Sequence, residues 1–167
     1  MYDVCVIGLG YVGLPIAALW ASSGLNVQGV DNDKAKLEGL RSGANIHEEP
    51  DVAELVRSAS SQGLLSFDEK PKAADFFVIA VPTPVLSSKS ADMGLVFEAI
   101  ESIGQEDING KVVIIESTCA PGAAKIVERT FSSRGWVFDV VMAPERVLPG
   151  ETLKEIKEND RIIGGAK

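Results

Sequence analysis

Three glycines spaced as G-x-G-x-x-G lie in the segment GLGYVG, which runs from Gly8 to Gly13. Gly8 permits a sharp turn after a strand, Gly10 lets a backbone approach a diphosphate, and Gly13 lets a helix pack closely on the sheet. The start of that helix presents free N–H groups and a partial positive charge to an anion. The spacing therefore predicts a binding site for the diphosphate of a dinucleotide.

Asp31 lies at the end of the next apolar run, in the segment NVQGVD. A carboxylate at this place can accept hydrogen bonds from both hydroxyls of an adenosine ribose, and it repels a 2′-phosphate. The cofactor that fits is therefore NAD rather than NADP. The alternative is a glycine turn that binds nothing, followed by an Asp that caps a helix. The strand before the loop and the helix after it disfavour that alternative.

An acid and a base, Glu145 and Arg146, directly follow an apolar run in the segment VVMAPERVLPG. Pro144 and Pro149 restrict the backbone on either side of the pair. If the run is a strand that ends at a ligand cleft, the prolines fix the geometry of the charged pair before a substrate arrives. Taken without other information, an exposed loop with adjacent charges is the simpler interpretation.

Two threonines also follow apolar runs of strand length. Thr83, between two prolines in VPTP, either presents its hydroxyl to a cofactor ribose or belongs to a rigid loop. Thr118, in ESTCAPG, either donates a hydrogen bond at the same edge of the sheet or caps the next helix. Cys119 has no neighbouring histidine to form a thiolate, so a structural cysteine is favoured. His47 lies in a polar stretch and is interpreted as a solvated loop residue without a role.

These residues must be positioned by apolar runs that alternate with segments of helical spacing. Runs without polar alternation predict strands covered on both faces, and their alternation with helices predicts parallel order. The fold class is therefore α/β, with a doubly wound, mostly parallel, Rossmann-like sheet and helices on both faces. The predicted strands cover residues 2–10, 26–31, 74–81, 111–117, 136–143 and 160–165, and the predicted helices cover residues 11–24, 32–43, 51–65, 94–104 and 121–135.

The composition argues against several classes of protein. With 167 residues, 46% of them hydrophobic, the chain is long enough for one domain with a buried core. A net charge of −8 without a Lys and Arg cluster argues against nucleic acid or an anionic membrane surface as a partner. The apolar runs are too short to span a membrane, so a cytoplasmic location is expected. One histidine and two cysteines argue against a zinc site and a disulfide framework, so no metal is expected.

Five motifs occur in order along the chain, namely VCVIGLGYVGLPIA, VPTP, EST, APERVLPG and RIIGG. Together they resemble the N-terminal domain of the UDP-glucose/GDP-mannose dehydrogenase family, and the resemblance covers essentially all 167 residues. Within this family, APERVLPG is most similar to the UDP-N-acetyl-D-mannosamine dehydrogenases. The second acid that the glucose enzymes carry in this motif is replaced by Pro149, which weakens a glucose-specific interpretation.

The resemblance implies an enzyme that oxidises the C6 alcohol of a UDP-sugar to a carboxylate in two hydride transfers to NAD, supplying precursors of surface polysaccharides. It also implies that a central helix and a C-terminal sugar-nucleotide domain, with the nucleophilic cysteine and the catalytic lysine, lie outside this chain. Residues 1–167 would then be the NAD-binding domain of a homodimeric enzyme, and alone they should bind NAD without turnover. UDP-glucose 6-dehydrogenase, another nucleotide-sugar dehydrogenase and a stand-alone NAD-binding module remain as alternatives.

Matching the family's motifs position by position assigns roles to individual residues. The residues that match NAD contacts are Gly8, Gly10, Tyr11, Val12, Gly13, Asp31, Thr83 and Thr118. Lys36 matches a lysine near the adenosine ribose, and Thr118 is also counted with the catalytic residues. Glu145 matches an acid that assists water or proton transfer in the second oxidation. Arg146 and Val147 match a segment that contacts the sugar nucleotide.

Overall fold

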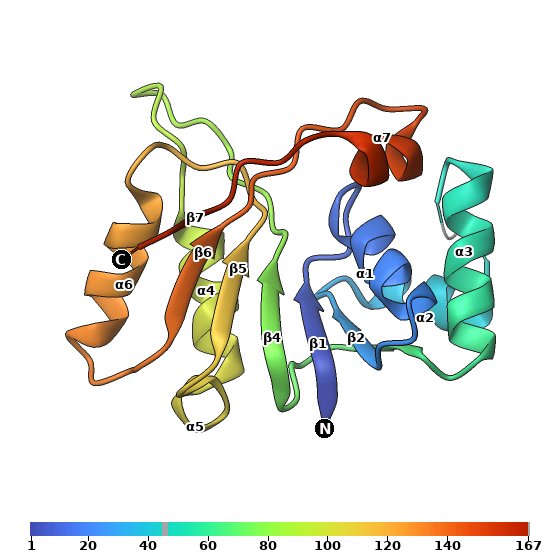
Figure 1. Cartoon of the computed structure of the whole chain (residues 1–167), viewed down its shortest axis with the longest axis horizontal. Coiled ribbons are helices and arrows are strands. Elements are labelled where there is room, and N and C mark those ends of the chain that lie inside the picture. The colour runs from blue at the N-terminus through green and yellow to red at the C-terminus, as the bar shows by residue number, and fades with distance from the viewer. Residues whose placement is uncertain (45–46, 167) are drawn as a thin grey trace.

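The computed structural model describes residues 1–44 and 47–166, and over these residues the chain forms one seven-stranded sheet (Figure 1). The strands lie in the order β3-β2-β1-β4-β5-β6-β7, and neighbours run parallel except β7, which is antiparallel to β6. The strands are β1 (Tyr2–Ile7), β2 (Val27–Val30), β3 (Leu65–Asp68), β4 (Ala74–Ile79), β5 (Val112–Ile115), β6 (Asp139–Met142) and β7 (Gly164–Gly165). The predicted mostly parallel, doubly wound sheet is confirmed.

Helices connect the strands and lie on both faces of the sheet (Figure 1). They are α1 (Gly13–Ser22), α2 (Lys34–Ser42), α3 (Pro50–Ser61), α4 (Gly94–Ile103), α5 (Gln105–Ile108), α6 (Ala123–Ser132) and α7 (Thr152–Glu158). Residues of α1, α2, α3 and α7 enter one hydrophobic cluster, and residues of α4, α5 and α6 enter a second. Within the described ranges, no helix combines the length and the apolar character that a membrane span would need.

Alternate residues of the strands face the two clusters. In β1, Val4 and Val6 pack with α1, whereas Cys5 and Ile7 belong to the cluster that contains α4 and α6. Burying one such aliphatic side chain stabilises the fold by about 1.5–3 kcal/mol, so both helical layers are held against the sheet. Burial on both faces is the reason that the central strands appear in the sequence as unbroken apolar runs.

The direction of strand addition reverses between β1 and β4. From β1 the chain continues to β2 and β3 on one side, and it then returns to β4 on the other side of β1. Ile7, the last residue of β1, pairs with Val30 of β2 and with Ile79 of β4, which are the last residues of their own strands. The loops that follow these strands therefore gather at one edge, at the kind of switch point where open α/β sheets bind ligands.

Several element boundaries differ from the sequence prediction. The helix predicted over residues 51–65 is α3 followed by a separate strand, β3, because Gly63 turns the chain with a φ of 72°. The helix predicted to open with Pro121 begins only after Gly122, whose φ of 90° lies outside the helical region. The short helices α5 and α7 are absent from the prediction, because four to seven residues carry too little of a helical apolar pattern.

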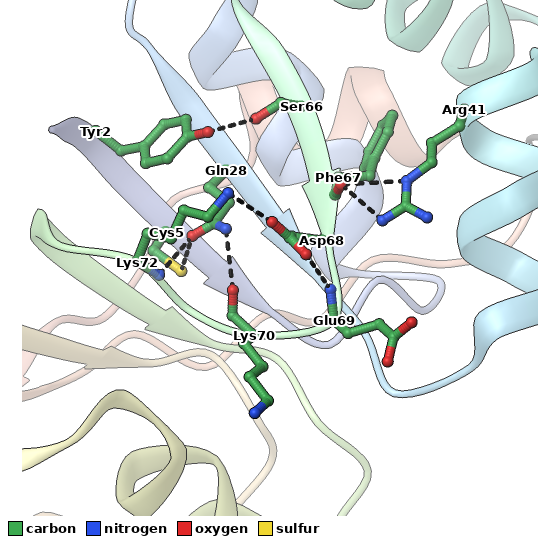
Figure 2. Close-up of polar contacts among 10 residues, drawn as sticks. All are labelled: Tyr2, Cys5, Gln28, Arg41, Ser66, Phe67, Asp68, Glu69, Lys70 and Lys72. Carbon is green, nitrogen blue, oxygen red and sulfur yellow. Dashed lines mark hydrogen bonds and ion pairs between the residues drawn. The ribbon is translucent and has the colours of Figure 1, made fainter.

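Gln28 is a buried polar residue of β2 that fixes the connection between β3 and β4 (Figure 2). Its amide oxygen accepts a hydrogen bond of 2.8 Å from the Lys72 N–H and one of 3.4 Å from the Cys5 thiol. Its amide nitrogen donates to the Lys70 carbonyl oxygen at 3.1 Å. Burial raises the pKa of Cys5 to about 12, so this thiol is not a nucleophile. One side chain thus anchors two points of a connecting loop to the sheet.

Candidate functional site

An open cleft of about 750 Å³ lies at the carboxyl ends of the central strands, where the loops after β1, β2, β4, β5 and β6 meet. Most of the predicted site residues line it, namely Gly8, Gly10, Tyr11, Val12, Asp31, Lys36, Thr83, Thr118 and Glu145. Gly13, Arg146 and Val147 are not part of its lining. Residues from widely separated motifs are therefore brought to one place, as a strand-end site requires.

The glycine loop has the geometry that a diphosphate requires. Gly8 has a φ of 95°, and a Cβ there would lie 2.6 Å from the Ala80 carbonyl oxygen. A Cβ on Gly13 would overlap the Gly8 carbonyl oxygen. A Cβ on Gly10, by contrast, would have no described atom within 4 Å, so this glycine faces open space. A phosphate that approaches the backbone would occupy this open space next to Gly10.

The helix that follows the loop begins without a side-chain cap. The residue before α1, Val12, makes no side-chain hydrogen bond to the helix, and no acidic residue lies in the first turn. Its N-terminal N–H groups therefore keep their partial positive charge available to an anion. An acidic chain can hold an anionic ligand by this local geometry.

Asp31 is buried, with 8% of its surface exposed, and its carboxylate accepts hydrogen bonds from three directions. The donors are the Leu9 N–H at 2.9 Å, the Asp33 N–H at 3.0 Å and the Lys36 ammonium at 2.8 Å. Burial opposes ionisation, but the Lys36 ammonium and the two backbone donors outweigh it and lower the pKa of Asp31. A carboxylate has about four acceptor positions, so this ionised group keeps capacity for a ribose hydroxyl.

Thr83 and Thr118 join the loops after β4 and β5. The Thr83 hydroxyl donates to the Thr118 carbonyl oxygen at 2.6 Å, and the Ser117 hydroxyl donates to the Val81 carbonyl oxygen at 2.7 Å. The proton of the Thr83 hydroxyl is therefore used within the protein, and its oxygen remains an acceptor. The Thr118 side chain is exposed in the cleft and does not cap α6, which begins after Gly122.

Glu145 belongs to a cluster of two buried carboxylates and one half-buried base. Its Oε2 lies 3.1 Å from the Arg161 guanidinium, which also pairs with Glu116 and donates to the Ala143 carbonyl oxygen at 2.7 Å. Burial raises the pKa of Glu116, and the charge of Glu145 adds to this effect while Arg161 opposes it. The sequence prediction missed Glu116 and Arg161, although both lie in motifs that it quoted, EST and RIIGG.

Arg146 lies on the outer side of the same segment. Its guanidinium donates to the Asp160 carbonyl oxygen at 3.1 Å, and its N–H donates to Glu145 Oε1 at 2.7 Å. The side chain is exposed, and Val147 beside it is half-buried. The predicted sugar-nucleotide segment therefore borders the cleft without lining it.

Tyr11 reaches from the glycine loop to a second set of residues that the sequence prediction missed. Its hydroxyl donates to Glu49, contacts the Thr152 hydroxyl and accepts a hydrogen bond of 3.2 Å from the Gly150 N–H. No local pattern could reveal these contacts, because the partners lie far from Tyr11 in the sequence. The Tyr11 hydroxyl is therefore engaged inside the protein, although the residue is also part of the cleft lining.

Cys119 and His47 have ordinary structural surroundings. Cys119 packs against the cluster that contains α4 and α6, and burial raises the pKa of its thiol, which agrees with a structural cysteine. His47 is half-buried, in contrast to the predicted solvated residue. Its Nδ1 accepts a hydrogen bond of 3.1 Å from the Glu49 N–H, and its ring centroid lies 5.4 Å from that of Tyr11.

Comparison with known proteins agrees with this geometry. A family model described as the UDP-glucose/GDP-mannose dehydrogenase family, NAD binding domain, matches residues 2–167. The chain belongs to this family. Because the match is to the NAD-binding domain, the cofactor of this chain is NAD, as the sequence predicted.

Several individual members of this family are similar to the chain over almost its whole length. UDP-N-acetyl-D-mannosamine dehydrogenase of Methanocaldococcus jannaschii is 42% identical over 97% of this chain and 38% of its own length. NDP-N-acetyl-D-galactosaminuronic acid dehydrogenase of Ralstonia nicotianae is 40% identical over 97% of this chain and 41% of its own length. The structure of UDP-N-acetyl-mannosamine dehydrogenase from Staphylococcus aureus superposes with a TM-score of 0.92 at 38% identity, covering 98% of this chain and 42% of that one. The chain spans about two fifths of each relative.

Proposed function

We propose that this chain is the NAD-binding domain of a UDP-N-acetyl-D-mannosamine 6-dehydrogenase, which oxidises the sugar's C6 alcohol to a carboxylate. The observation that carries the proposal is the cleft, which is lined by the glycine loop before the uncapped helix α1, by the ionised Asp31 and by Glu145. The 42% identity to a relative of that name supports the choice of sugar.

Different residues of the cleft would bind different parts of the cofactor. The N–H groups at the start of α1 would bind the diphosphate, with Gly10 leaving room for it. Asp31 and Lys36 would bind the adenosine ribose, and Thr83 and Thr118 would lie toward the nicotinamide. When bound, NAD supplies the acceptor for the two hydrides that leave the sugar.

Glu145 is the residue proposed to move a proton. Its Oε2 is buried and has no hydrogen-bond partner among the described residues, while its charge is balanced by Arg161 at 3.1 Å. Because Glu145 also lines the cleft, its carboxylate would assist proton transfer in the second oxidation once the complete site brings a water or a substrate hydroxyl to it. Arg146 and Val147, on the rim, would contact the sugar nucleotide.

The rest of the activity is proposed to lie in the remainder of a longer enzyme. A central helix and a C-terminal domain would supply the nucleophilic cysteine, the catalytic lysine, most of the sugar-nucleotide site and the dimer contacts. Residues 1–167 alone would then bind NAD without turnover. A stand-alone NAD-binding module is the alternative from another class, and a reading frame that stops just after Lys167 would favour it.

Another nucleotide sugar is the second candidate substrate. The Ralstonia relative, named for an N-acetyl-D-galactosaminuronic acid, is nearly as similar as the mannosamine enzyme, at 40% against 42% identity. UDP-glucose is less favoured, because Pro149 stands where the glucose enzymes carry a second acid. Assaying the full-length parent with each sugar nucleotide while following NADH separates these substrates. A preference for UDP-glucose would refute the mannosamine assignment.

Calorimetric titration of this chain with NAD and NADP tests the cofactor site directly. We expect Asp31→Ala to weaken NAD binding by about tenfold to a hundredfold, the usual effect of losing a hydrogen bond to a charged group. Asp107→Asn on α5, an exposed acid outside the cleft lining, is the matched control and should bind NAD normally. Unchanged affinity in the Asp31 variant would rule out its contact with the ribose.

A further inference from the structure

Glu49 receives hydrogen bonds from two segments that are distant in sequence. The Tyr11 hydroxyl reaches it from the glycine loop. The Gly150 N–H donates to it at 3.1 Å, and Thr152 donates twice, through its N–H at 2.9 Å and its hydroxyl at 2.6 Å. Glu49 itself immediately precedes α3, so three parts of the chain meet at one carboxylate.

The two segments joined by Glu49 carry different parts of the proposed site. The glycine loop would bind the cofactor diphosphate, and residues 145–152, the sugar-nucleotide segment, would carry Glu145 and Arg146 toward the sugar. The Gly150 N–H contacts both the Tyr11 hydroxyl, at 3.2 Å, and Glu49, so the two segments are also bonded directly. A displacement of either segment must therefore break or stretch bonds to the same two groups.

The charge of Glu49 makes these bonds strong. The carboxylate is buried, with 9% of the residue exposed. Burial opposes its ionisation, but the Thr152 hydroxyl, the Tyr11 hydroxyl and the two backbone N–H groups outweigh this and lower its pKa to about 2. Hydrogen bonds to an ionised acceptor are roughly twice as strong as neutral ones, so the junction is firm at neutral pH.

We infer that Glu49 is a positioning residue that couples the glycine loop to the sugar-nucleotide segment, so that NAD bound against the glycine loop orders residues 145–152. This inference rests on the proposed function, because it assumes that the glycine loop binds NAD and that residues 145–152 contact the sugar nucleotide. A purely structural junction would hold α7 in place and leave cofactor affinity unchanged.

Thr152 separates these two interpretations, because it bonds Glu49 but does not line the cleft. In Thr152→Val the two hydroxyl contacts are lost while the size of the side chain is kept. We expect NAD affinity, measured by calorimetry, to fall about threefold to tenfold, the usual effect of one hydrogen bond. Thr152→Ser keeps the hydroxyl and should restore the affinity. A folded Thr152→Val chain with wild-type NAD affinity would overturn the inference.

Hydrogen exchange provides a test that needs no ligand. In the free chain, Tyr11→Phe removes one oxygen from the glycine loop and should speed the exchange of the Gly150 and Thr152 amides by about threefold or more. Thr152→Val should in turn speed exchange over residues 9–13. Unchanged exchange at the distant segment in both variants would contradict the coupling. In wild-type protein, NAD should slow exchange over residues 148–152, and NAD that binds without this effect would also contradict it.

The failure of the proposed function would look different. If the folded wild-type chain takes up no NAD, the cofactor site itself is wrong. The coupling between the two segments can still be tested by hydrogen exchange in the free chain. Tyr11→Phe is then measured at the Gly150 and Thr152 amides, and Thr152→Val is measured at residues 9–13.

Discussion

Gly10 and Gly13 serve different purposes in one loop, and a methyl group at each separates them. In Gly13→Ala the Cβ overlaps the Gly8 carbonyl oxygen, so we expect the free energy of unfolding to fall by about 1–3 kcal/mol. In Gly10→Ala the Cβ enters open space, so stability should change by less than about 1 kcal/mol while NAD affinity falls at least about tenfold. Denaturant unfolding and calorimetric titration measure the two effects.

Each glycine variant is the control for the other. Equal losses of stability in the two variants would contradict the assignment of Gly13 to packing. Normal NAD binding by Gly10→Ala would contradict the diphosphate position.

Single residues were predictable where the signal is local. The glycine spacing and the distance to Asp31 lie within one strand-turn-helix-strand unit, so the sequence alone indicated a dinucleotide site. Glu49 and Arg161 act through partners far along the chain, Thr152 for the first and Glu116 for the second. The sequence does not indicate which distant backbone group or carboxylate a charged side chain will contact, so neither residue could be assigned a role from sequence.

The connection between β3 and β4 depends on Gln28, a polar residue in a buried strand. We expect Gln28→Leu, which keeps most of the volume, to lower the free energy of unfolding by about 2–4 kcal/mol, because three hydrogen bonds are lost. Exchange of the Lys72 amide should become faster than in the wild type. Gln62→Leu, at an exposed position at the end of α3, should change neither quantity. Wild-type exchange at Lys72 in the Gln28 variant would show that the loop is held by other contacts.

Elements were predictable in proportion to their burial. The strands β1, β4 and β5 lie inside the sheet, where most of their side chains pack into one of the two hydrophobic clusters, so each is a mostly apolar run that periodicity detects. Strand β3 lies at the edge, and within LSFD only Leu65 is fully buried, so its sequence lacks that signature. Helix α7 could not be predicted for the same reason. Among its described residues, Thr152 and Leu153 are the buried ones, so the helix has no periodic apolar face.

The stability of the whole domain should depend on acid through Glu49. Its pKa is about 2 in the folded chain and near the ordinary 4.5 when unfolded, so the folded state favours the ionised form. This contribution is fully present above about pH 4.5 and is lost as the pH falls toward 2. We expect urea unfolding of the wild type to become easier across this interval, and Glu49→Gln to remove part of that dependence.

A neighbouring acid provides the control for the acid experiment. Glu48 is exposed and carries the same charge one residue earlier, so Glu48→Gln should keep the wild-type pH profile. If Glu49→Gln shows the same profile as Glu48→Gln, the low pKa of Glu49 does not contribute to stability between pH 4.5 and 2.

Asp31 has a practical consequence for redesign. Its carboxylate is proposed to choose the unphosphorylated dinucleotide, and it also accepts the Leu9 N–H that shapes the glycine turn. Replacing this acid with a neutral or basic residue, in order to admit NADP, also removes the acceptor of the Leu9 N–H. The glycine turn then loses a hydrogen bond that holds its shape. A preference switch at this position should therefore need a second substitution that supplies an acceptor for Leu9.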